Sequence, residues 1–158
     1  MNFKFADIGD TDRLLKLRFD YFAAENFEYS PGMGKQMQSQ LEEYFPKHIN
    51  QDFFAALAED ESGEVRAVAF LVIFEKPANS RSFPTGRSGL ILNVLTYPQH
   101  RRQGYATKLL NLLIGEAKAR KLSYIELSAS EMGMPMYEKL GFKLPEPSHF
   151  TDMKLNLL

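Results

Sequence analysis

The sequence predicts a single mixed α/β domain, and three observations support that fold class. In the first half, two helix patterns precede two apolar strand patterns that a polar turn separates. From residue 90 onward, strand and helix patterns alternate. The chain has 158 residues, a length that suits one domain with a sizeable core and is too short for two ordinary domains. We therefore expect one domain over residues 1–158.

The expected elements of the first half follow from periodicity and from turn residues. Alternation of polar and apolar residues at 2–5 predicts a short strand. Asp10 or Thr11 can cap the first helix, because their side chains accept hydrogen bonds from the unpaired N–H groups of a helix start. Pro31 and Gly32 then interrupt the pattern. The next expected elements are a helix at residues 34–44, a strand at 53–58, a turn at 59–64 and a strand at 65–74.

The second half begins with a loop and then alternates strands with helices. Residues 75–89 are rich in Pro, Ser, Gly and Arg, which is typical of a mobile loop. The strongest helix pattern covers residues 104–120 and has an apolar stripe on one face. A shorter helix at 135–140 has Pro135 in its first turn and Gly141 at its C-terminal stop. The expected strands are residues 90–97, 124–128 and 153–157.

Composition excludes several classes of function. The chain has no cysteine, so it has no disulfide, thiolate metal site or cysteine nucleophile. His48, His100 and His149 are too scattered for a metal-ligand pattern, and we expect no metal. A net charge of −1 gives no general attraction to nucleic acid or to an anionic membrane. There is no secretory signal pattern and no apolar run of membrane-spanning length, so the expected compartment is the cytoplasm.

The segment between the strand at 90–97 and the following helix predicts an anion site. The strand pattern ends at Pro98, Arg101 and Arg102 follow, and Gly104 opens the helix. No Ser, Thr, Asp or Asn stands in front of the first turn, although up to four backbone N–H groups lack partners there. The helix dipole and the arginines favour an anion, and glycine permits a close approach. We interpret the segment as a cradle for a pyrophosphate.

Two common phosphate-binding loops do not fit this segment. A Walker A loop needs Lys followed by Ser or Thr, but Thr107 precedes Lys108 here and the first glycine is missing. A dinucleotide fingerprint needs three closely spaced glycines, and Gly115 lies far down the helix. When this segment is considered alone, the alternative interpretation is a helix start whose free N–H groups bind only water.

Two motifs in the right order identify a family. Arg101, Gly104 and Ala106 fit the pattern (Gln/Arg)-x-x-Gly-x-(Gly/Ala) of an acyl-coenzyme-A loop. Residues 136–142, Met-Tyr-Glu-Lys-Leu-Gly-Phe, resemble the signature Leu-Tyr-x-x-Leu-Gly-Phe. Both motifs belong to the GCN5-related N-acetyltransferase (GNAT) family, and the sequence resembles that family closely over residues 90–143.

This resemblance implies a fold and a cofactor site. The expected sheet has six to seven strands, is mostly antiparallel, splays between its fourth and fifth strands and is flanked by about four helices. Acetyl-CoA would bind at the splay as co-substrate, with its pyrophosphate on backbone N–H groups of residues 102–107 and its pantetheine beside residues 94–96. A backbone N–H of Leu95 or Thr96 would polarise the thioester carbonyl. The implied contacts are Val94, Leu95, Thr96, Arg101, Arg102, Gln103, Gly104, Tyr105, Ala106 and Thr107.

The resemblance also implies the chemistry, direct attack of a primary amine of a small molecule or peptide on the bound thioester. Tyr137 matches the tyrosine that donates to the departing thiolate in many relatives, with core packing as its alternative role. Glu126 is the candidate base. Alternation places it on the face of Tyr124 and Ser128, which could line a cleft or meet water.

Other questions stay open at this stage. A module that binds or senses acyl-CoA without turnover is the alternative to an enzyme. Tyr21, Glu25, Glu28 and Tyr29 form an acidic and aromatic group that could attract a cationic amine, but they define no substrate class. An exposed last strand could pair between two subunits, so a homodimer is a further alternative.

Overall fold

The computed structural model describes all 158 residues and divides into two compact units, residues 1–128 and residues 129–158. The first unit contains a five-stranded sheet and three α-helices. Its elements are β1 (Asn2–Phe5), α1 (Thr11–Ala24), α2 (Pro31–His48), β2 (Phe53–Glu59), β3 (Val65–Glu75), β4 (Arg87–Thr96), α3 (Tyr105–Ala119) and β5 (Ile125–Glu126), with 3₁₀ turns η1 (Ile8–Asp10) and η2 (Pro98–His100). None of the helices combines the length and the hydrophobicity that a membrane-spanning helix needs.

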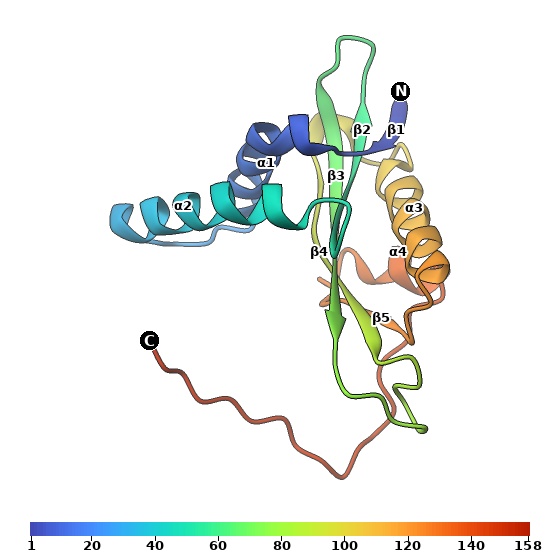
Figure 1. Ribbon diagram of the computed structural model, residues 1–158. Coiled ribbons are helices and arrows are strands. Elements are labelled where there is room, and N and C mark those ends of the chain that lie inside the picture. The colour runs from blue at the N-terminus through green and yellow to red at the C-terminus, as the bar shows by residue number, and fades with distance from the viewer. The chain divides into compact units, whose positions relative to one another are not determined.

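The sheet has the strand order β1-β2-β3-β4-β5 (Figure 1). The pairs β1–β2, β2–β3 and β3–β4 are antiparallel, whereas β4 and β5 are parallel. This arrangement confirms a mixed α/β fold with a mostly antiparallel sheet and four helices. The expected number of six to seven strands is wrong, because the structure contains five.

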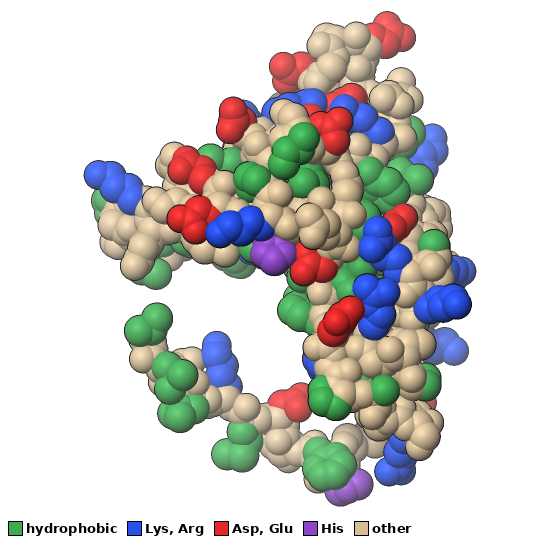
Figure 2. Space-filling view, in the orientation of Figure 1, with side chains coloured by type: hydrophobic (Ala, Val, Ile, Leu, Met, Phe, Trp, Pro, Cys, Tyr) green, Lys and Arg blue, Asp and Glu red, His purple; other side chains and the backbone are tan.

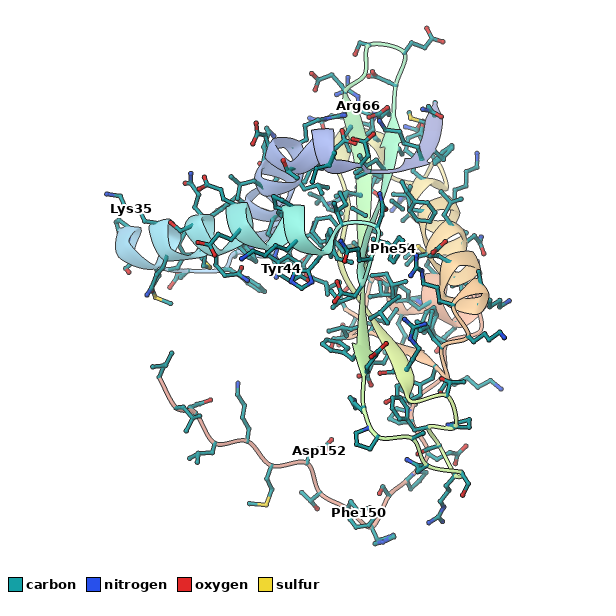
Figure 3. The ribbon with its side chains drawn as sticks, in the orientation of Figure 1. Lys35, Tyr44, Phe54, Arg66, Phe150 and Asp152 are labelled. Atoms are coloured by element: carbon teal, nitrogen blue, oxygen red, sulfur yellow. The ribbon has the colours of Figure 1, made fainter.

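Helices cover both faces of this sheet. In Figure 1, α1 and α2 lie on one side of the sheet and α3 lies on the other. Successive residues of β2 therefore meet different helices: Phe53 packs against Tyr44 of α2, whereas Phe54 lies under Arg120 at the end of α3 (Figure 3). Because helices cover both faces of the sheet at β2, every residue of this strand is buried. The core on the side of α1 and α2 includes Leu14, Leu17, Phe45, Phe53, Ala55, Leu57, Val68, Phe70 and Leu95.

The start of α2 corrects the expected boundaries of the second helix. The helix covers Pro31–His48 instead of residues 34–44. The Ser30 side chain accepts a hydrogen bond from the N–H of Met33, and Pro31 stands at the first helical position. Proline is favourable there because its missing N–H would have no partner in any case. Pro31 and Gly32 are therefore the first two residues of the helix and do not form a break before it.

The second unit corrects another expectation. It contains one short helix, α4 (Met134–Lys139), and residues 143–158 form no regular structure. The expected strand at 153–157 is therefore wrong. Its apolar side chains alternate, but a strand also needs a partner to accept its backbone hydrogen bonds. Figure 2 shows the hydrophobic side chains spaced along this exposed segment, where Met153, Leu155 and Leu157 are all more than 80% exposed.

A cluster of charges ties the start of α1 to the sheet. Arg13 contacts Asp10 at 2.7 Å and Glu59 at 2.8 Å, and Lys4 contacts Glu59 at 3.1 Å. Asp10 is 6% exposed. Its burial would raise the pKa of the carboxyl, but the Asp7 backbone N–H, Arg13 and Lys4 outweigh burial and hold this pKa below its ordinary value. The ionised Asp10 therefore stabilises the fold.

We predict that Asp10→Asn lowers the free energy of unfolding at pH 7 by about 1–3 kcal/mol, because it breaks a charge-assisted bond inside the cluster. A carboxyl with a lowered folded-state pKa contributes stability above its unfolded pKa, and this contribution is lost as the pH falls below about 4. The variant should therefore lose less stability than the wild type between about pH 5 and about pH 3. Denaturant unfolding at several pH values measures this. Asp12→Asn, at an exposed position without an ion pair, is the matched control; equal acid sensitivity of wild type and Asp10→Asn would contradict the assignment.

Candidate functional site

Strand β4 contains a bulge in its second half. Val68 pairs with Leu95 and Phe70 pairs with Leu92, so that Asn93 and Val94 together oppose the single residue Ala69. Asn93 has a φ of 55°, in the left-handed region that asparagine tolerates better than most residues. The bulge re-aims the strand from Val94 onward.

The side chain of Asn93 connects this bulge to α1. The amide is 1% exposed and needs hydrogen-bond partners. Its Nδ2 donates to the Leu17 carbonyl at 3.5 Å, and its Oδ1 accepts from Nη1 of Arg18 at 3.1 Å. Asn93 is therefore a buried polar anchor at the bend of β4.

On its other edge, β4 separates from β5 almost at once. The parallel pairing covers only two pairs, Gly89 with Ile125 and Leu90 with Glu126. Gly89 is required at this close approach, since a Cβ there would lie 2.7 Å from Leu71 Cδ1 and 2.8 Å from Ile125 Cγ2. Beyond Leu90, β4 has no strand partner on this side. Its edge therefore offers backbone hydrogen-bonding groups to a ligand.

The chain then turns into α3 through two left-handed residues. Arg102 has a φ of 61° and Gly104 a φ of 76°, and α3 starts at Tyr105 without a side-chain cap or an acidic residue in its first turn. The first backbone bond of the helix runs from the Lys108 N–H to the Gly104 carbonyl. The N–H groups of residues 102–107 donate to no acceptor in the protein. This uncapped helix start matches the sequence expectation and forms an anion-binding geometry.

The side chains of this loop are largely exposed. Arg101 Nε donates to the Thr96 carbonyl at 3.1 Å, so its guanidinium folds back onto the end of β4. Arg102 is exposed, and Tyr105 Oη donates to Gln103. The structure thus brings two sets of expected cofactor contacts together, residues 94–96 on the strand and residues 101–107 on the loop.

The two expected catalytic residues lie elsewhere in the chain. Glu126 is exposed on β5, opposite Leu90 in the register, which is four residues or ~13 Å along β4 from Val94. Tyr137 lies in the second unit, where its buried ring packs edge-on against Phe142 with centroids 6.0 Å apart. Their roles remain predictions.

A polar group surrounds the end of β4 on the side of α1. Tyr97 Oη donates to Asp20, which also pairs with Lys16. Burial and then Asp20 raise the pKa of Tyr97. A cavity of about 450 Å³ lies here and is lined by Lys16, Glu64, Val65, Arg66, Tyr97, Gln99 and His100. Lys16 and Arg66 both have carboxylate partners, so neither cation of this group is unpaired.

Sequence reasoning missed Arg18. It lies one turn after Leu14 and one turn before Phe22, inside the apolar stripe of α1. A charged residue within such a stripe is the signal that could have identified it. Burial lowers the pKa of its guanidinium, and no carboxylate lies close enough to form an ion pair.

The sequence model of the acetyltransferase (GNAT) family matches residues 14–142, most of the chain. The chain belongs to the GNAT family. It is therefore an acyltransferase of the N-acetyltransferase type. Among curated proteins, none matches the sequence significantly.

Solved structures with the same fold agree with this membership. A predicted acetyltransferase from Clostridium acetobutylicum, solved with acetyl-CoA, is 29% identical over 97% of this chain and 95% of that chain, with a TM-score of 0.82. A GCN5-related N-acetyltransferase from Ralstonia eutropha is 22% identical over 98% and 97% of the two chains, with a TM-score of 0.75. Glucosamine-6-phosphate N-acetyltransferase from Arabidopsis thaliana is 16% identical over 98% and 100%, with a TM-score of 0.67. The last two similarities concern the fold alone.

Proposed function

We propose that residues 1–158 act as one N-acetyltransferase domain that transfers an acetyl group from acetyl-CoA to a primary amine of a small molecule or peptide. Both substrates would be bound at the same time. The observation that carries the proposal is the run of unpaired backbone N–H groups at residues 102–107, directly beside the free edge of β4. The acetyl-CoA in the similar Clostridium structure supports the choice of co-substrate.

The helix start would bind the pyrophosphate. Its free N–H groups and the positive end of the α3 dipole favour an anion, and no acidic residue in the first turn opposes it. A Cβ at Gly104 would meet no atom within 4 Å, so the surface above this residue is open. Arg101 and Arg102 add positive charge nearby.

The free edge of β4 would bind pantetheine as an added strand. The Tyr97 N–H donates to the Arg66 carbonyl of β3. Since backbone groups alternate sides along a strand, the N–H of Thr96 points away from β3, toward the free edge. Of the two expected donors, Thr96 is thus better placed than Leu95 to polarise the thioester carbonyl and to stabilise its developing oxyanion.

The reaction would be a direct transfer. The amine nitrogen bonds to the acetyl carbon and loses a proton to a base or to water, the carbon–sulfur bond breaks, and the CoA thiolate takes up a proton. Holding both reactants in line supplies much of the rate gain. Tyr137 is the proposed donor to the thiolate. Full proton transfer from a phenol of pKa ~10 to a thiolate whose thiol has a pKa of ~8.5 is uphill by about 2 kcal/mol, so a strong hydrogen bond serves equally well.

Glu126 is the proposed base only for acceptors whose amine arrives protonated. Its exposed position supports a contact with bulk water as readily as one with substrate. An amine that is already neutral needs no protein base.

Acetyl-CoA titration with a thermal-shift readout, followed by thiol release over a panel of amines, tests the proposed function. We expect stabilisation by acetyl-CoA and thiol release that depends on an amine. Stabilisation without release from any amine would indicate binding without turnover, and no stabilisation would refute the proposed site.

We predict that Gly104→Glu weakens acetyl-CoA binding at least ~10-fold more than Gly104→Gln. Both variants strain the left-handed backbone equally, by about 1–2 kcal/mol, but only glutamate places a negative charge where the pyrophosphate would lie. Isothermal titration measures the two affinities, and thermal unfolding checks that the strain is matched. Equal affinities of the two variants would contradict the loop assignment.

We predict that Tyr137→Phe lowers kcat by roughly 10- to 100-fold, because it removes a hydrogen bond to a charged sulfur worth about 1.5–3 kcal/mol. The affinity for acetyl-CoA should stay within about twofold, since phenylalanine keeps the packing against Phe142. Steady-state thiol release measures kcat. Phe142→Leu, which alters that packing and keeps the phenol, is the control; a similar loss of kcat in both variants would indicate a structural role for Tyr137.

A further inference from the structure

Arg18 is a half-buried cation without a charged partner. Its guanidinium lies 4.5 Å from the centre of the Phe22 ring and 5.9 Å from that of Tyr21. Each of the other partly buried arginines of the first unit forms an ion pair with a carboxylate; these are Arg13, Arg66, Arg87 and Arg120. Arg18 forms none, although withdrawal from water makes an unpaired charge costly.

Most of the hydrogen-bonding capacity of Arg18 is unused. A guanidinium has five N–H donors, and the only protein acceptor that Arg18 meets is Oδ1 of Asn93. Its remaining nitrogens keep contact with solvent, because no nitrogen of Arg18 is both fully buried and without a hydrogen-bond partner. The aromatic rings thus hold the guanidinium in place and leave a side of it open to a ligand.

Arg18 lies near the part of β4 where the thioester of acetyl-CoA is proposed to bind. Asn93, its hydrogen-bond partner, forms the bulge directly before residues 94–96. Thr96, the proposed oxyanion donor, lies three residues or ~10 Å farther along the strand. An acceptor whose amine is aligned for attack beside Thr96 can reach Arg18 with a second group. That group must lie a few bonds from the amine.

The surroundings of Arg18 favour an anion over a cation. Tyr21, one of the residues that could attract a cationic amine, lies beside the Arg18 guanidinium, and so does Phe22. A second cation there would be repelled. Carboxylate and phosphate oxygens match the fork of N–H donors of a guanidinium, and they bind it in pairs of parallel hydrogen bonds.

We propose that Arg18 binds an anionic group of the acceptor, so that the substrate is an amine that also carries a carboxylate or a phosphate. This inference rests on the proposed function. The competing role for Arg18 is structural, a link between α1 and the β4 bulge through Asn93 alone.

The surroundings of Phe22 suggest that an acceptor with an apolar side chain should be among the amines tested. This ring, which lies against the guanidinium, lines a cavity of about 470 Å³ together with Asn26, Phe27, Glu28, Tyr29, Met33 and Met37. An aromatic amino acid could place its carboxylate on Arg18 and its ring among the apolar side chains of this cavity.

The test uses pairs of amines that differ only in the anionic group: L-phenylalanine with L-phenylalaninamide for a carboxylate, and phosphoethanolamine with ethanolamine for a phosphate. Thiol release gives kcat and KM for the full wild-type chain and for the variants Arg18→Gln and Arg18→Lys. Glutamine keeps an amide donor but removes the charge, and the bond from Asn93 to the Leu17 carbonyl remains in both variants. Lysine keeps the charge and loses the fork of donors.

We expect the wild type to favour the anionic member of at least one pair by 10-fold or more in kcat/KM. In Arg18→Gln, the KM for that member should rise at least 10-fold, while the neutral member and the affinity for acetyl-CoA stay within twofold. Arg18→Lys should retain part of the preference. A wild type that favours the neutral members, or an Arg18→Gln variant that loses both members equally, would overturn the inference.

Direct titration of the same amines into the CoA-bound protein separates this inference from the proposed function. Thiol release with neutral amines only would leave the proposed function standing and refute the role of Arg18. Selective binding of anionic amines that requires Arg18, without thiol release from any amine, would support the anion site and refute the transfer. No binding of any anionic amine would overturn the inference whatever the turnover.

Discussion

Strand β4 carries the central constraint of this protein, because it pairs along nearly its whole length with β3 and for only two residues with β5. Gly89 allows the two strands to approach, and the bulge at Asn93 bends β4 immediately afterwards. A strand edge left unpaired in the middle of a sheet exposes backbone donors and acceptors that a ligand can use. The proposed acetyl-CoA site depends on this edge and on the uncapped start of α3 that follows it.

The bulge is stable because other parts of the first unit hold it. Asn93 is buried and bonded to Leu17 and Arg18, so the orientation of α1 and the bend of β4 are coupled. The start of α1 is in turn fixed to the sheet by the charge cluster around Asp10. Helix α1 therefore supports the free edge of β4, where acetyl-CoA is proposed to bind, and also places Arg18 near that edge. In our account, cofactor binding and acceptor selection share one structural support.

The sequence was sufficient for the parts of the fold that rest on local chemistry. The uncapped start of α3 follows from residue types alone, and so does the short helix between Pro135 and Gly141. The left-handed φ of Gly104 emerges only from the structure. Pro31 was misread because proline both ends and begins helices, and Ser30 decides which. The apolar alternation at residues 153–157 was misread because pairing is a long-range property. Arg18 was missed because its meaning depends on Asn93, which lies 75 residues away in the chain.

Amide hydrogen exchange with and without acetyl-CoA tests the central claim most directly, since it reads the backbone donors themselves. We predict slower exchange on addition of acetyl-CoA at Thr96 and at residues 102–107, whose N–H groups would gain acceptors. The amides of β2 should be unaffected, because this strand already pairs with β1 on one side and with β3 on the other. Protection that leaves Thr96 and the start of α3 unchanged and appears elsewhere would contradict the proposed site.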